Sequence, residues 1–157
     1  MSNTRILIAL LLLIGCSSII GFYPIYFIQI QVNQDHCRIF SNHLELQWIH
    51  SVEKTTWLEH YQIKHKKFVL QYTDFVSFGA GTPTHYPIIF QKNGWIRMDV
   101  NLSVKDIYWT ISNHMQGIII FQHQQWSIYK DYPDYSIVHI SIQQQPLWRV
   151  LRLGQCL

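Results

Sequence analysis

Apolar and polar side chains alternate with a period close to two along the middle of the chain. Residues 44–48, 57–63 and 68–72 place mostly apolar or aromatic side chains at every second position. Successive side chains of a strand point to opposite faces, so this pattern predicts strands with one buried face. Further runs are rich in Ile, Val, Tyr, Trp and Phe, which favour strands, and they span residues 88–90, 95–100, 117–121, 126–129, 136–142 and 147–153.

Turn-forming residues separate these runs. Asn93-Gly94 tolerates positive φ and predicts a hairpin, while residues 131–134 and 143–146 predict a turn and a loop. Residues 102–113 predict a short helix, with Ser103 as its N-cap. About ten short strands at this spacing predict an all-β fold, a compact antiparallel sandwich or barrel-like domain.

An uncharged, apolar stretch precedes the predicted strands. No residue between Arg5 and Asp35 carries a charge at neutral pH. A helix over residues 6–23 would be about 27 Å long, close to the thickness of a hydrocarbon core of about 30 Å. Pro24 lacks the N–H that a further helical turn needs, so it is the expected end of this N-terminal apolar helix.

This segment has three interpretations. It is a single-pass membrane anchor, or a secretory signal cleaved near Gly15, or a lipoprotein signal, since residues 13–16 resemble a bacterial lipobox with Cys16 as the lipidated residue. Each interpretation places the domain outside the cytoplasm. The chain then consists of a membrane anchor or signal segment, residues 1–24, and an extracytoplasmic β domain, residues 25–157.

The two remaining cysteines are candidates for a disulfide. Cys37 follows the apolar segment and Cys156 is the penultimate residue of the sequence. Outside the cytoplasm the environment is oxidising, so a bond between them would tie both ends of the domain together. The alternative is two separate buried thiols.

Composition and charge exclude several classes of protein. Apolar residues make up 48% of the chain and charged residues 13%, which excludes a largely disordered protein. Twelve basic residues against nine acidic ones, without runs, argue against nucleic acid as a partner. The nine histidines form no helical pair and no Cys-x-x-Cys is present, so neither a metal site nor a cofactor is expected.

One signature carries a resemblance to a known family. A predicted strand ends in His-Ser-Val-Glu at residues 50–53, Trp57 and Glu59 follow on the next strand, and Gly-Ala-Gly forms a turn at residues 79–81. This arrangement resembles the family called domain of unknown function 1850. The resemblance implies a small exported bacterial protein of a kind often encoded beside TRAP transporters of the TAXI type, which take up organic anions.

The signature has a binding and a structural interpretation. In the first, polar side chains surround one strand connection and backbone amides of the glycine turn converge on an anion. In the second, His50 and Ser51 close the strand on the glycine turn, and Glu59 pairs with Lys54 or a buried neighbour. The candidate binding residues are His50, Ser51, Glu53, Glu59, Gly79 and Gly81.

Catalysis has less support in the sequence. Neighbours on a strand point to opposite faces, so His50 and Ser51 cannot form a hydrogen-bonded dyad there, and no Gly-x-Ser-x-Gly motif is present. We therefore expect no catalytic residues. The family resemblance implies a non-catalytic accessory protein in a bacterial inner membrane, with its domain in the periplasm, that contacts the membrane and the membrane subunits of a TAXI-type TRAP transporter. The alternatives are an envelope hydrolase with a carboxylate or serine site, and a purely structural envelope domain.

Overall fold

The computed structural model describes residues 6–8, 10–11, 13, 15, 21–79 and 81–157. Among these residues, no helix is both long enough and apolar enough to cross a membrane. The predicted anchor or signal segment, residues 1–24, lies in large part outside the described residues, and so does the candidate lipidation site, Cys16.

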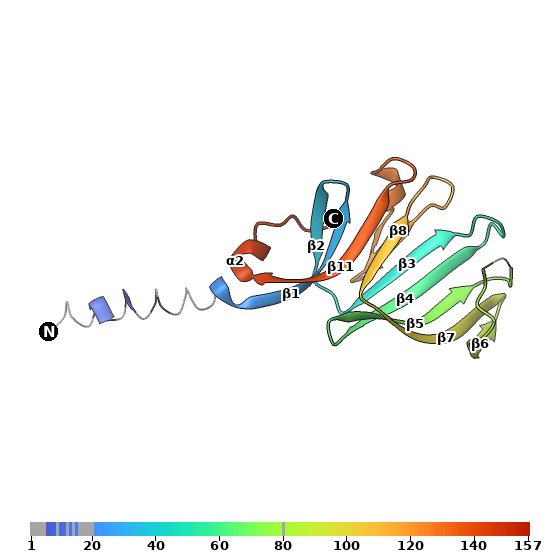
Figure 1. Ribbon diagram of the computed structural model, residues 1–157, viewed down its shortest axis with the longest axis horizontal. Coiled ribbons are helices and arrows are strands. Elements are labelled where there is room, and N and C mark those ends of the chain that lie inside the picture. Colours follow the sequence, from blue (N-terminus) through green and yellow to red (C-terminus); the bar gives the residue numbers. More distant parts are fainter. Residues whose placement is uncertain (1–5, 9, 12, 14, 16–20, 80) are drawn as a thin grey trace.

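The fold is all-β and antiparallel, as the alternation predicts, and it contains two sheets (Figure 1). The smaller sheet has the order β2 (Asp35–Ile39), β1 (Pro24–Val32), β11 (Ile137–Pro146) and β8 (Asp106–Thr110). The larger sheet has the order β10 (Gln124–Trp126), β9 (Ile118–Phe121), β3 (His43–Ile49), β4 (Thr56–Lys64), β5 (Lys67–Phe75), β7 (Trp95–Val104) and β6 (Ile88–Lys92). Two short helices follow late in the chain, η1 (Ile128–Lys130) and α2 (Leu147–Val150).

The main core lies between the two sheets. Ile28 and Ile140 of the smaller sheet belong to the same buried cluster as Leu44 and Leu46 of β3. Because side chains alternate along a strand, burying Leu44 and Leu46 turns Glu45 to the opposite face of the larger sheet. The larger sheet therefore has an inner face toward the core and an outer face.

A second apolar cluster covers the inner face farther along the larger sheet. Trp57, Phe75, Ile96 and Met98 form this cluster on β4, β5 and β7. All four side chains are buried, and Phe75 is fully inaccessible. This cluster supports the part of the sheet that carries the family signature.

The helix predicted for residues 102–113 is wrong. These residues finish β7 and form β8, which pairs with β11 at the edge of the smaller sheet. Asp106 pairs with Ser141 and Thr110 with Ile137, so the segment obtains its hydrogen bonds from a neighbouring strand. Long-range pairing outweighs the local capping signal of Ser103, as it often does for β-branched and aromatic residues.

The end of the chain corrects two further predictions. Residues 143–146 are paired strand, because β11 runs on beside the start of β1 up to the pair Pro24–Pro146. Residues 147–150 form α2 and not a strand. Their alternating pattern predicted a strand, but no strand of the described residues pairs with them. Pro146 immediately precedes the first turn of the helix, where its missing N–H costs nothing.

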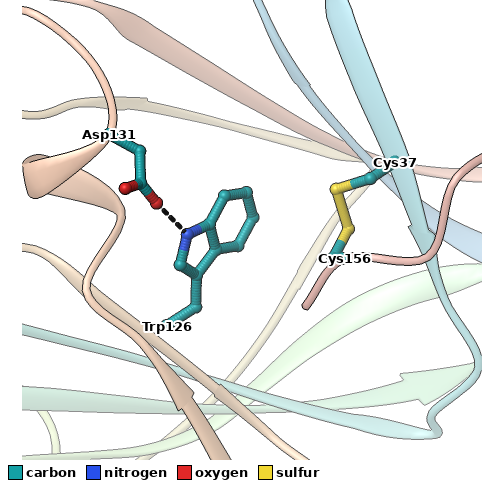
Figure 2. Close-up of a disulfide and its surroundings, with 4 residues drawn as sticks. All are labelled: Cys37, Trp126, Asp131 and Cys156. Atoms are coloured by element: carbon teal, nitrogen blue, oxygen red, sulfur yellow. Dashed lines mark hydrogen bonds between the residues drawn. A yellow bond between two sulfur atoms is a disulfide. The ribbon is translucent and has the colours of Figure 1, made fainter.

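A disulfide joins the smaller sheet to the end of the chain. Cys37 on β2 and Cys156 are bonded, with their Cα atoms 5.0 Å apart and a sequence separation of 119. Figure 2 shows this bond near the indole of Trp126, whose Nε1 donates a hydrogen bond of 2.6 Å to Asp131. The disulfide and Trp126 line one small cavity of about 170 Å³. The last residues are thereby fixed to the same sheet in which the domain begins.

Candidate functional site

The His-Ser-Val-Glu motif forms the connection between β3 and β4. The backbone N–H of His50 donates to Thr55 O at 2.9 Å, and that of Lys54 donates to His50 O at 3.0 Å. The N–H of Glu53 donates to His50 Nδ1 at 3.2 Å. His50 therefore closes its own turn, while Ser51 lies exposed.

The two halves of the signature meet at Glu53 and Gly79. A Cβ added to Gly79 would overlap the carboxyl group of Glu53, so the backbone of the glycine turn lies directly against that side chain. The N–H of Gly79 donates to Thr82 Oγ1 at 2.9 Å, and the N–H of Thr82 donates to Gly79 O at 3.2 Å. Gly81 has a φ of +80°, which favours glycine. Ala80 lies outside the described residues.

Two amides at the described residues of the glycine turn are already engaged. The N–H groups of Gly79 and Thr82 donate within the turn, and the carboxyl group of Glu53 lies against Gly79. At these residues the contacts favour the structural interpretation of the signature, while binding of an anion stays a prediction.

Aromatic rings connect the turn to the second apolar cluster. The ring of His50 stacks on Trp57 at 4.9 Å between centroids, and Trp57 stacks on Phe75 at 5.3 Å. Phe78, just before Gly79, packs edge-on against Phe75 at 5.4 Å. The signature therefore surrounds one aromatic column on the inner face of the larger sheet.

Glu59 lies on the same face, two residues beyond Trp57. It accepts a 2.6 Å hydrogen bond from the hydroxyl of Tyr61, a buried neighbour. Burial raises the pKa of the Glu59 carboxyl, and the bond from Tyr61 offsets part of this rise. Burial, together with the adjacent carboxyl, also raises the pKa of Tyr61. Glu59 is thus a proton acceptor held in apolar surroundings.

Two further polar atoms near Glu59 lack a partner. Within the described residues, the buried Nε1 of Trp57 and the buried Oγ1 of Thr73 make no hydrogen bond. Thr73 stands directly opposite Glu59 in the pairing of β4 with β5. Buried polar groups normally have partners, so this part of the inner face has unused hydrogen-bonding capacity.

A polar network that the sequence analysis did not identify occupies the outer face. His60 Nδ1 lies 3.0 Å from Glu45 Oε1, and His60 Nε2 lies 3.1 Å from Asp74 Oδ2. Arg97 donates two hydrogen bonds of 2.6 Å to the two oxygens of Asp74. The guanidinium carbon also lies 4.0 Å from the ring centre of Tyr72, on which His60 packs at 4.2 Å.

The charges of this network depend on one another. Burial alone would raise the pKa of Asp74, but hydrogen bonds from Arg97 and His60 outweigh it and lower the pKa. The same carboxylate raises the pKa of Arg97. His60 can donate to both Glu45 and Asp74 only when both of its ring nitrogens carry a proton.

Two adjoining cavities open beside this network. One, of about 240 Å³, is lined by His60, Tyr72 and residues around them. The other, of about 760 Å³, extends over the connection from β2 to β3 and the turn from β9 to β10, where Tyr26, Phe40 and His123 line it. Both are also lined by His43 and Glu45, so we describe them together as the outer groove. It offers exposed imidazoles, a carboxylate and aromatic walls to a bound group.

Comparison with known proteins gives one match. Residues 44–128, more than half of the chain, match the family described as Domain of unknown function (DUF1850). The chain belongs to this family. No curated protein and no solved structure matches.

The DUF1850 segment begins with β3 and ends at the start of η1. It therefore includes the signature turn, Glu59 and the outer-face network, but not the strands β1, β2 and β11 of the smaller sheet. Glu45 and His60 could have been noticed in the sequence as polar residues on the outward positions of β3 and β4. Their partners Asp74 and Arg97 could not, because strand register decides which residues face each other.

Proposed function

We propose that this DUF1850 protein is a non-catalytic binding protein of the bacterial envelope. In this proposal, residues 1–24 hold it at the inner membrane, residues 25–157 lie in the periplasm, and the domain serves as an accessory of a TAXI-type TRAP transporter. The transporter link is drawn from family membership. The outer groove is the observation that carries the binding role.

The groove has the features of a binding surface. Its two cavities meet at His43 and Glu45, where a carboxylate and an imidazole are accessible. The floor is held rigid by the hydrogen bonds of His60 to Glu45 and Asp74, so the carboxylate is fixed before anything binds. Preorganisation of this kind lowers the entropic cost of association.

The disulfide supports the location. A bond between Cys37 and Cys156 persists in the periplasm but would be reduced in a cytoplasm. The uncharged stretch before Asp35 supports attachment to the membrane. Intact mass measurement of the mature chain distinguishes an uncleaved anchor from a lipoprotein at Cys16 and from cleavage near Gly15.

Copurification tests the accessory role. The tagged protein is extracted from its native membrane in mild detergent, and associated proteins are identified by mass spectrometry. We expect TRAP transporter membrane subunits to be recovered with the wild type and to be lost with His43→Ala combined with His123→Ala. Both histidines are exposed, so the fold should remain intact.

A matched pair of substitutions provides the control. His85 and His114 are also exposed but lie outside the groove, so His85→Ala combined with His114→Ala should leave recovery unchanged. Recovery of no stoichiometric partner by the wild type would refute the accessory role. Equal loss in both double variants would refute the assignment of the contact to the groove.

A further inference from the structure

The helix α2 lies beside the start of β1, where the chain enters the domain (Figure 1). The N–H of Leu147 donates to Tyr23 O at 3.0 Å, and Pro146 pairs with Pro24. Residues from the two ends of the described domain therefore share one pole of the molecule. We call this surface the entry pole and define it by Phe22, Tyr23, Trp148, Arg149, Leu151 and Arg152.

The entry pole combines exposed apolar side chains with two cations. Phe22, Tyr23 and Leu151 are 69%, 63% and 66% exposed, although each is large and apolar or aromatic. Arg149 and Arg152 are exposed as well. Single exposed apolar residues are ordinary, but several together beside arginines mark an interaction surface.

The two arginines are held in a common arrangement by Trp148. Each guanidinium carbon lies 5.1 Å from the centre of the Trp148 ring, within range of a cation–π contact. The helix α2 is itself held to β2, because Arg38 Nη1 donates to Val150 O at 2.6 Å. The cations are therefore presented on a supported turn.

The two segments that build the entry pole contain no acidic side chain. The sequence contains no Asp or Glu after Asp134, and no charged residue between Arg5 and Asp35. Both segments that build the entry pole thus lack carboxylate side chains. Its chemistry, aromatic and apolar groups beside guanidinium, matches the interface of a bilayer that contains anionic phospholipid.

We propose that the entry pole docks on anionic phospholipid headgroups and thereby orients the domain on the membrane. Arg149 and Arg152 contact phosphate groups, while the exposed side chains of Phe22, Tyr23 and Leu151 enter the interface between headgroups and acyl chains. Trp148 is half-buried, with its Nε1 inaccessible, and lies beneath the two guanidinium groups close to that interface. This inference rests on the proposed attachment of residues 1–24 to a membrane. Attachment through these residues does not by itself require the entry pole to contact lipid. A domain docked in this way keeps the outer groove at a fixed orientation to neighbouring membrane proteins.

Tryptophan quenching in vesicles tests the proposal. The full chain is reconstituted into vesicles of phosphatidylcholine, alone or mixed with phosphatidylglycerol, with acyl chains brominated next to the headgroup. We expect the brominated lipid to quench part of the tryptophan emission, and Trp148→Phe to lose that part. Arg149→Gln combined with Arg152→Gln should reduce quenching in the mixed vesicles to the level seen in phosphatidylcholine alone.

The control removes two positive charges elsewhere. Lys92 and Lys130 are exposed and lie outside the entry pole, so Lys92→Gln combined with Lys130→Gln should quench like the wild type. If the chain floats with the vesicles but Trp148→Phe is quenched as strongly as the wild type, the docking proposal is overturned while membrane attachment stands. If the chain does not float with vesicles, the attachment fails and the docking proposal fails with it.

A protein partner is the competing occupant of the entry pole. If the double arginine variant is quenched like the wild type but recovers fewer transporter subunits, the surface belongs to a protein contact and the lipid proposal is overturned. The arginine variants also keep the test informative if Trp148→Phe does not fold, because they leave the indole in place.

Discussion

The carboxyl group of Glu53 occupies the space that a side chain at Gly79 would need. These residues are 26 positions apart in sequence (79 minus 53), and their contact joins the β3–β4 turn to the loop after β5. The family signature is therefore a single packed unit built from two segments. A side chain at residue 79 would require the carboxyl group of Glu53 to move from its present position.

Gly79→Ala should destabilise the protein by displacing Glu53. We expect a loss of about 1 to 2 kcal/mol in the free energy of unfolding, because a Cβ there cannot coexist with the present position of the carboxyl group. Chemical denaturation measures this loss. Gly154→Ala is the control, since a Cβ at Gly154 meets open space.

A double-mutant cycle locates the cause. If the clash with Glu53 is responsible, Gly79→Ala should cost clearly less in a Glu53→Ala background, and the two effects should not add. Strict additivity would contradict the contact.

Loss of the disulfide should destabilise the domain strongly. Cys37→Ser combined with Cys156→Ser removes a link that closes a loop of 119 residues, and we expect a loss of about 2 to 5 kcal/mol. Thermal unfolding with and without a reductant measures the effect. The wild type in reductant should approach the double variant, and an unchanged Tm in both cases would disprove a stabilising disulfide.

Glu59 should make stability depend on pH. Its pKa is raised in the folded state above the usual value of 4.5, so the folded protein holds this proton more tightly than the unfolded chain. The stabilisation that comes from tighter proton binding at Glu59 is fully present below pH 4.5, and it is lost as the pH rises through the pKa of Glu59 in the folded state. Glu59→Gln should therefore gain stability relative to the wild type as the pH rises from 4.5 toward neutral.

Tyr61→Phe provides a second test of the same site. The hydroxyl of Tyr61 donates to Glu59 and lowers the pKa of the Glu59 carboxyl. Removing this hydroxyl should raise that pKa further, so the pH dependence of Tm should extend to higher pH. If the difference in Tm between Glu59→Gln and the wild type were constant with pH, Glu59 would not have a raised pKa.

Asp74→Asn should weaken the outer-face network. Arg97 would lose a bidentate carboxylate partner and His60 a second acceptor, and we expect a cost of about 2 to 3 kcal/mol at neutral pH. The pKa of Asp74 is lowered below 3.8, so its stabilising effect is present above pH 3.8 and disappears as the pH falls through the folded pKa. The cost of Asp74→Asn should shrink accordingly in acid.

Asp106→Asn serves as the matched substitution on a strand. Asp106 has longer contacts, 3.6 Å to His139 and 4.0 Å to Lys105, so its loss should cost less than about 1 kcal/mol. Equal costs at Asp74 and Asp106 would mean that the network does not stabilise the fold.

Most strands of the larger sheet were predictable because their pattern is local, but the strand predicted at residues 126–129 is wrong beyond Trp126, since η1 begins at Ile128. Leu44 and Leu46 alternate with polar residues, and the burial of these leucines follows that alternation. Asn93-Gly94 also forms the predicted hairpin between β6 and β7, with Asn93 at a φ of 54°. Local chemistry alone decides these features.

Other features depend on contacts that are distant in sequence. Residues 102–113 carry a capping signal, yet they become strand because β11 supplies their hydrogen bonds. The outer groove could not be predicted either, since His43 at the start of β3 and His123 in the turn from β9 to β10 line it together only in the folded chain. For the site, the sequence analysis identified the signature residues but not Glu45, His60 or their partners in the outer-face network.

The disulfide also decides how the domain would carry a mechanical load. A tension applied between Tyr23 and the chain end beyond Cys156 runs along β1 into β2 and crosses the sulfur–sulfur bond at Cys37. Residues 38–155 then lie on a covalently closed loop outside the path of the force. The sheet that bears the family signature would remain unloaded while the ends of the chain are pulled.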